Sequence, residues 1–141
     1  MKSKAPLSLM EQLIMVLVFA LAAAVCVQAF VLADRLSVKN ERRDQAVLRA
    51  ETVAEVYKNC RGDSGAAAGK MGGSVEKNVW TTWWNANGGR AERKDAVYRV
   101  TVTPEAAEKP QGRAAVTVTG ADGSNLFTLK IAWQEAAESA R

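Results

Sequence analysis

The sequence predicts an α+β fold in which one long N-terminal helix packs by its second half on an antiparallel sheet of about four strands. Three observations support this prediction. The run from Leu13 to Ala33 contains no charged residue, and no Gly or Pro occurs between Leu7 and Arg61. After Ser74 the chain contains several short runs that alternate apolar and polar residues. A helix-first chain with a β-rich C-terminal part is therefore expected.

The first part of this helix, residues 13–33, is called the apolar segment below. Gln28 is its only polar side chain, and Cys26 behaves there as a small hydrophobe. At 1.5 Å per residue, a helix of this length reaches roughly 30 Å, the thickness of a bilayer's hydrocarbon core. We therefore expect membrane lipid around the apolar segment.

The helical pattern continues beyond the apolar segment. After the charged stretch 34–45, apolar residues return at spacings that form one stripe of a helix, namely Val47, Ala50, Val53 or Ala54, and Tyr57. The prediction is one helix over residues 7–59. Because its last turns carry an apolar face that must be buried, we expect that face to lie on the sheet.

Residues 60–78 are expected to form a Gly-rich loop, and residues 79–141 an antiparallel β head. The stretch from Arg61 to Ser74 contains five of the ten glycines and no β-branched residue. Four strands are expected in the β head, over residues 79–84, 96–103, 113–119 and 126–133. Turns are expected at 85–89 and 120–125, with a longer charged loop at 104–112.

Three tryptophans lie in the first predicted strand, with Trp80 and Trp84 on one face and Trp83 on the other. At least one should therefore be exposed or cover an edge, and we expect packing in the core and at an edge rather than a platform for a ligand or partner. Four basic residues near them could contact single-stranded nucleic acid: Arg90, Arg93, Lys94 and Arg99. Glu92 and Asp95 interrupt this cluster, so nucleic acid is not an expected partner.

The composition argues against an enzyme. The net charge is +4, but nineteen Lys and Arg are interleaved with fifteen Asp and Glu, and the chain has no histidine. The usual general base and the commonest metal ligand are therefore missing. Cys60 is a lone thiol because Cys26 lies in the apolar segment. No phosphate-binding loop, metal-ligand spacing or nucleophile motif is found, so no cofactor and no metal are expected.

The stretch PLSLMEQLIMVLVFALAAA, residues 6–24, resembles the start of type IV pilins and of the pseudopilins of type II secretion and competence systems. In that family a short basic leader precedes a hydrophobic helix with one glutamate near its start. The resemblance implies that residues 1–6 are a leader, which a prepilin peptidase removes between Pro6 and Leu7, and that Glu11 becomes the fifth residue. The family's leader usually ends in glycine. Pro6 fixes φ and lacks an amide hydrogen, which leaves inefficient cleavage, a specialised peptidase or no cleavage open.

The resemblance further implies a structural subunit, a minor pilin or pseudopilin, in a pilus-like or secretion-type filament. It would be a single-pass protein of the cytoplasmic membrane of a prokaryote, with the β head outside, and its partners would be other such subunits and the assembly machinery. The new amine of Leu7 in one subunit would pair with Glu11 of its neighbour. A carboxylate in an apolar bundle is costly without such a partner.

Two other functions fit the same residues. One is a non-polymerising binding module on a permanent single-pass anchor, which an uncut leader would favour. The other is a secreted domain whose signal peptide is cut after Ala29, at the end of Val27-Gln28-Ala29. Charge bias alone favours a cytoplasmic β head, because Lys2 and Lys4 precede the apolar segment whereas four cations follow it, Arg35, Lys39, Arg42 and Arg43.

Overall fold

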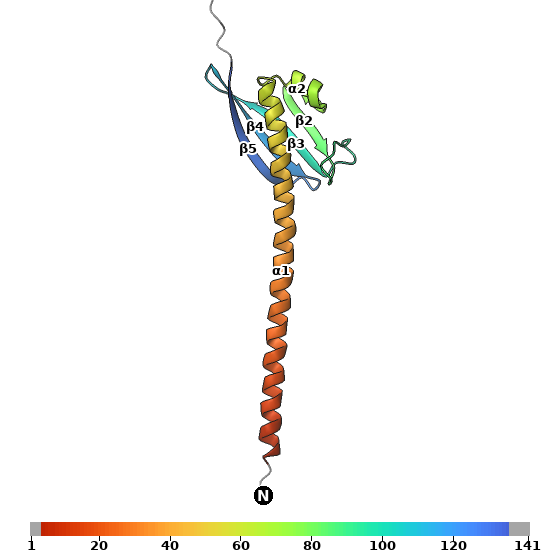
Figure 1. Cartoon of the computed structure of the whole chain (residues 1–141), viewed down its shortest axis with the longest axis vertical. Helices are drawn as coiled ribbons and strands as arrows, with labels where there is room; N and C mark the ends of the chain where they lie inside the picture. The colour runs from red at the N-terminus through yellow and green to blue at the C-terminus, as the bar shows by residue number, and fades with distance from the viewer. Residues whose placement is uncertain (1–3, 136–141) are drawn as a thin grey trace, which may run out of the picture. The chain divides into compact units, whose positions relative to one another are not determined.

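The computed structural model describes residues 4–135. The fold is α+β, as predicted, with a long helix followed by an antiparallel sheet (Figure 1). The chain divides into two compact units, Met1–Asn40 and Glu41–Arg141. The elements in chain order are α1 (Ala5–Asn59), α2 (Ser64–Met71), β1 (Ser74–Glu76), β2 (Val79–Trp84), β3 (Tyr98–Glu105), β4 (Gln111–Gly120) and β5 (Asn125–Gln134).

Helix α1 begins two residues before the predicted start. The Ser8 amide donates to the carbonyl of Lys4 at 3.2 Å, which places Pro6 in the first turn. Proline is tolerated there because the first amides of a helix have no intrahelical acceptor. The predicted continuation through the charged stretch 34–45 is observed, since no residue of that stretch interrupts α1.

The C-terminal end of α1 coincides with the predicted one. Arg61 and Gly62 both adopt positive φ, at 53° and 77°, which turns the chain out of the helix. The Gly62 amide then donates to the Tyr57 carbonyl at 3.1 Å, so one of the last helical carbonyls is satisfied.

Residues 60–78, expected to be a loop, contain helix α2 and strand β1. Asp63 caps α2, because its side-chain oxygen accepts from the amides of Gly65 and Ala66 at 2.9 and 3.1 Å. Strand β1 extends the sheet by pairing Ser74 with Thr81 of β2. The sheet therefore has five strands where about four were predicted.

The sheet is an antiparallel meander in the order β1-β2-β3-β4-β5, with a bulge between Val118 and Thr119. The four predicted strands are all present as β2 to β5. Strands β3 and β4 extend into the predicted loop 104–112, because Pro104 pairs with Ala114 and Glu105 with Arg113.

The core lies between one face of the sheet and the Glu41–Asn59 part of α1, which crosses that face in Figure 1. Tyr57 is 1% exposed and joins two strands, since its ring stacks on Trp80 at 6.3 Å and meets Trp133 edge-on at 5.4 Å. The buried stripe of α1 is Ala46, Ala50, Val53, Ala54 and Tyr57. It thus starts at Ala46, whereas Val47, the predicted first position, is half-buried.

Candidate functional site

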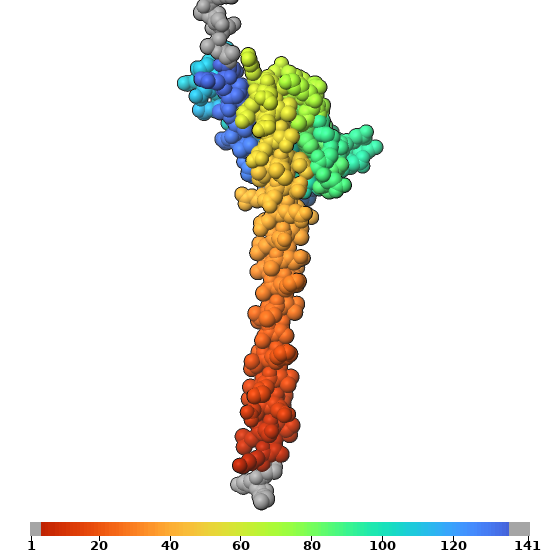
Figure 2. Space-filling model, viewed as in Figure 1, coloured from red at the N-terminus to blue at the C-terminus, as the bar shows by residue number. Residues whose placement is uncertain are grey.

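The apolar segment is the most distinctive surface of the described chain. Helix α1 contains a stretch near the N-terminus that is long and apolar enough to cross a membrane. Every residue from Lys4 to Asp44 is exposed. Figure 2 shows one side of this part of the chain, coloured red to orange. Leu13, Phe19 and Phe30 are 68, 76 and 79% exposed. A helix that is apolar on all sides is stable only when another apolar phase surrounds it.

The energy of that exposure can be estimated. Thirteen large apolar side chains between Leu13 and Leu32 are exposed. Burying one such side chain contributes about 1.5–3 kcal/mol, so covering all of them would contribute about 20 kcal/mol or more. That exceeds the roughly 5–15 kcal/mol that stabilises a typical domain. The apolar segment is therefore suited to lipid or to other apolar helices, and unsuited to water.

Glu11 lies two residues before the apolar segment and is exposed. Leu7 is one helical turn earlier on the same side of α1, because residues four apart in a helix are neighbours. Within residues 4–135 the two ion pairs join Lys94 to Glu92 and Lys130 to Glu105, so neither involves Glu11. The carboxylate is thus placed beside an apolar surface, where an external cation would stabilise it.

The predicted leader is described only from Lys4 onward; residues 1–3 lie outside the described part. Pro6 and Leu7 are both in the first turn of α1, so the bond between them is helical. A peptidase acting on that bond would first have to unwind this turn. Pro6 does not make unwinding easier, because the amide at this position would have no intrahelical acceptor in any case.

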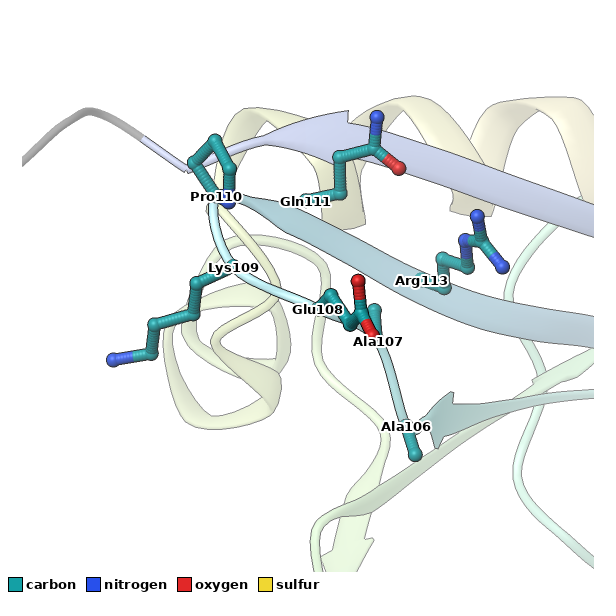
Figure 3. Close-up of a pocket in the computed structure, with 7 residues that line it drawn as sticks. All are labelled: Ala106, Ala107, Glu108, Lys109, Pro110, Gln111 and Arg113. Atoms are coloured by element: carbon teal, nitrogen blue, oxygen red, sulfur yellow. The ribbon is translucent and has the colours of Figure 1, made fainter.

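The compact unit Glu41–Arg141 is called the sheet unit below. In it, the β3–β4 loop lines a hollow of about 610 Å³ (Figure 3). Its polar side chains are Glu108, Lys109, Gln111 and Arg113. In Figure 3 the Lys109 side chain extends away from Glu108 and Arg113, so these groups do not converge on one point. A hollow without convergent polar groups lacks the usual feature of a catalytic or ligand site.

The predicted basic cluster is divided by the structure. The Arg90 guanidinium lies over the Trp84 ring at 5.6 Å, and Arg49 of α1 lies at the same distance from that ring. Both are cation–π contacts that pack the core edge. Arg93, Lys94 and Arg99 instead line a second hollow, beside Trp83. The predicted strand faces are confirmed, since Trp80 and Trp84 are buried whereas Trp83 is half-buried on the other face.

No group of three or more His, Cys, Asp or Glu side chains with metal-binding geometry occurs among residues 4–135. Cys26 is exposed in the apolar segment and Cys60 is half-buried after α1, and both are free thiols. Asp122, in the β4–β5 turn, is the one described group with a clearly perturbed pKa. The hydroxyl and then the amide of Ser124 donate to its carboxylate and hold its pKa below the ordinary value.

Comparisons of the chain with protein-family models, with curated proteins and with solved structures find no match. The functional argument therefore rests on the apolar segment, Glu11 and the surfaces of the sheet unit.

Proposed function

We propose that this protein is a structural subunit of a membrane-based filament, a minor pilin or pseudopilin. Its apolar segment anchors it by a single pass in the cytoplasmic membrane of a prokaryote, with the β head outside. The same segment then packs against apolar segments of sister subunits. The proposal rests on the resemblance of residues 6–24 to the pilin N-terminus and on the order of elements in the fold.

The observation that carries the proposal is the exposure of the apolar segment on every side. A span that only anchors a protein needs lipid around it, and so does a span awaiting assembly. Assembly replaces lipid contacts by helix contacts at little cost, since lipid tails and apolar side chains are similarly apolar. A helix with no polar face from Leu13 to Val27 can make that exchange in any direction around its axis.

In this proposal, the apolar segment holds neighbouring subunits together, and Glu11 determines their axial register. Apolar surfaces slide past each other with little preference for one register. A carboxylate next to them needs a cation, and leader removal would create one at the amine of Leu7. Pairing of that amine with Glu11 of a neighbouring subunit would define the axial offset between subunits.

The role of Glu11 is tested by replacing it with alanine and comparing Gln12→Ala, a matched change at the next position. A photo-crosslinking residue at Leu17, which is 59% exposed, reports contact between sister helices in membranes. We expect both variants to remain in the membrane fraction. Crosslinked multimers should decrease strongly for Glu11→Ala and remain at the wild-type level for Gln12→Ala. Unchanged multimers in Glu11→Ala would remove the assigned role.

A second candidate is a single-pass anchored binding module that does not polymerise. Pro6 in the helical first turn favours it, because a proline at that position departs from the family's glycine and the bond to Leu7 is not extended. Such a module would keep Met1 as its first residue. It would also give no sister crosslinks through Leu17, even in the wild-type chain, whereas a filament subunit gives them.

A further inference from the structure

A hollow of about 240 Å³ lies on the sheet unit where β2 ends and β3 begins, and the β4–β5 turn closes one side of it. Its lining includes Trp83 and Arg99, which are on the face of the sheet opposite to α1, and also Tyr98, which is buried in the core. Trp83 of β2 is paired across the ladder with Arg99 of β3, and Arg99 is paired with Thr119 of β4. Side chains of directly paired residues stand on the same face and within reach of each other. Trp83 and Arg99 therefore line this hollow side by side.

The hollow is strongly cationic. Arg93, Lys94 and Arg99 line it, and no lining residue is acidic. Within residues 4–135, Arg93 and Arg99 form no ion pair, and Lys94 contacts Glu92 at 3.4 Å between side chains that are 76 and 77% exposed. An ion pair so exposed contributes little and neutralises the cation weakly. Three positive groups thus line one small space, and Glu92 compensates only one of them, weakly.

An independent feature points to a missing acceptor. The indole Nε1 of Trp83 is buried, yet no hydrogen-bond acceptor for it lies among residues 4–135. The two tryptophans on the opposite face are satisfied, because Trp80 donates to the Gly72 carbonyl at 2.8 Å and Trp84 to the Thr82 hydroxyl at 2.9 Å. Trp133 also lacks an acceptor, but it lies on β5 and does not line this hollow. A buried donor without a partner is costly, so an acceptor that this nitrogen reaches by a small movement of the ring would be favoured.

The arrangement of the cations around one small hollow indicates which class of ligand fits it. Single-stranded nucleic acid is held by a groove of cations that follows a backbone, with several aromatic platforms. Here the cations line one hollow with one half-buried tryptophan, and Arg90, which would extend the cluster, is held over Trp84. That arrangement fits one compact anionic group.

We propose that the hollow is a binding site for an oxyanion, a carboxylate or a phosphate group. Arg99 and Arg93 donate hydrogen bonds to its oxygens, and Lys94 adds positive charge. Trp83 forms the flat wall, and a small rotation of its ring would bring Nε1–H to the anion. The site is independent of the apolar segment and of any assembly through it.

The test uses the full chain in a neutral detergent, with ¹⁵N-labelled tryptophan. Four indole N–H resonances are expected from Trp80, Trp83, Trp84 and Trp133, and Trp83→Phe identifies the relevant one. Inorganic phosphate and glutarate are titrated separately at constant ionic strength. The Trp83 resonance should shift saturably with at least one of them while the other three stay in place. The tighter of the two anions identifies the group as phosphate or carboxylate.

Two arginine variants make the test specific. Arg99→Gln should weaken binding at least about ten-fold, as expected for loss of a charge-assisted hydrogen bond. Arg113→Gln, a matched change of an exposed arginine on β4 outside the hollow, should leave the affinity unchanged. If Arg99→Gln shifts the other indole resonances and is therefore misfolded, Arg93→Gln replaces it.

The proposal is overturned if the Trp83 resonance does not shift at millimolar anion. It is also overturned if Arg113→Gln weakens anion binding as much as Arg99→Gln does, because that result would indicate non-specific electrostatic attraction. A short single-stranded oligonucleotide is titrated as well. Saturation by the oligonucleotide, with neither small anion binding, would replace the oxyanion site by a nucleic-acid surface.

Discussion

Replacing Gly112 by alanine tests how the end of α1 is held on the sheet. Gly112 of β4 is directly paired with Trp133 of β5, and an added Cβ would overlap the Trp133 ring. The φ of Gly112 is outside the left-handed region, so alanine can adopt this backbone. The destabilising effect of the substitution is therefore steric, and it opposes the backbone-entropy gain that alanine brings over glycine. The added methyl group forces the Trp133 indole away from its position over residue 112.

The expected cost follows from what Trp133 touches. Its ring meets Tyr57 of α1 edge-on at a centroid distance of 5.4 Å and an interplanar angle of 85°. Overpacking a filled site costs about 1–3 kcal/mol, and loss of an aromatic pair costs about 0.5–1.5 kcal/mol. Because Trp133 is only half-buried and can partly swing outward, we expect a loss of about 2 kcal/mol in the free energy of unfolding.

The assay is urea unfolding of the full chain in a neutral detergent, followed by tryptophan fluorescence. Gly69→Ala is the matched control, since Gly69 is exposed in α2 and an added Cβ there would have no heavy atom within 4 Å. Alanine in that helix should stabilise the protein by about 0.5–1 kcal/mol. The reasoning is refuted if Gly112→Ala lies within about 0.5 kcal/mol of the wild type, or if both variants change stability in the same direction.

Three further predictions concern the sheet unit. Asp63→Ala removes the cap of α2 and should cost about 1 kcal/mol, with faster amide exchange in the first turn of α2 as the readout. Val53→Ala, at a side chain that is 0% exposed, should cost about 2 kcal/mol, whereas Leu48→Ala, 50% exposed on the same helix, should cost much less in the same unfolding assay. The lowered pKa of Asp122 means that its contribution to stability is present above the ordinary aspartate pKa and is lost as pH falls through the folded-state value. Asp122→Asn should abolish that part of the acid-side stability loss, and a pH series of unfolding curves with unchanged acid dependence would contradict it.

Much of the fold could be predicted because local patterns and tertiary packing agree. Gly62 indicates where α1 ends. The alternation in β3 predicts which face of the strand is buried, and Tyr98, Val100 and Val102 on that face are at most 7% exposed. Helix α2 was not predicted because Gly65 and Gly69 lower helix propensity. Its available signals were the capping residue Asp63 and the alanine run that follows it.

Strand β1 and the cationic hollow depend on contacts between distant segments. Residues 74–76 are too few for an alternation to be recognised, and they form a strand because they pair with β2. The sequence places Arg93, Lys94 and Arg99 near one another but does not show that the β4–β5 turn closes the same hollow. It also does not show that Arg90 leaves the cluster for Trp84. The roles of Glu11, Pro6 and Leu7 stay predictions.

The most direct test of the proposed function is the N-terminal sequence and intact mass of the protein purified from membranes of cells that assemble it. We predict that the mature chain begins at Leu7, retains the apolar segment and has Glu11 as its fifth residue. A chain that begins at Met1 but contains the segment would support the anchored module instead. A mature protein beginning at Phe30 would contradict the proposal, because most of the apolar segment would be absent from the functional molecule.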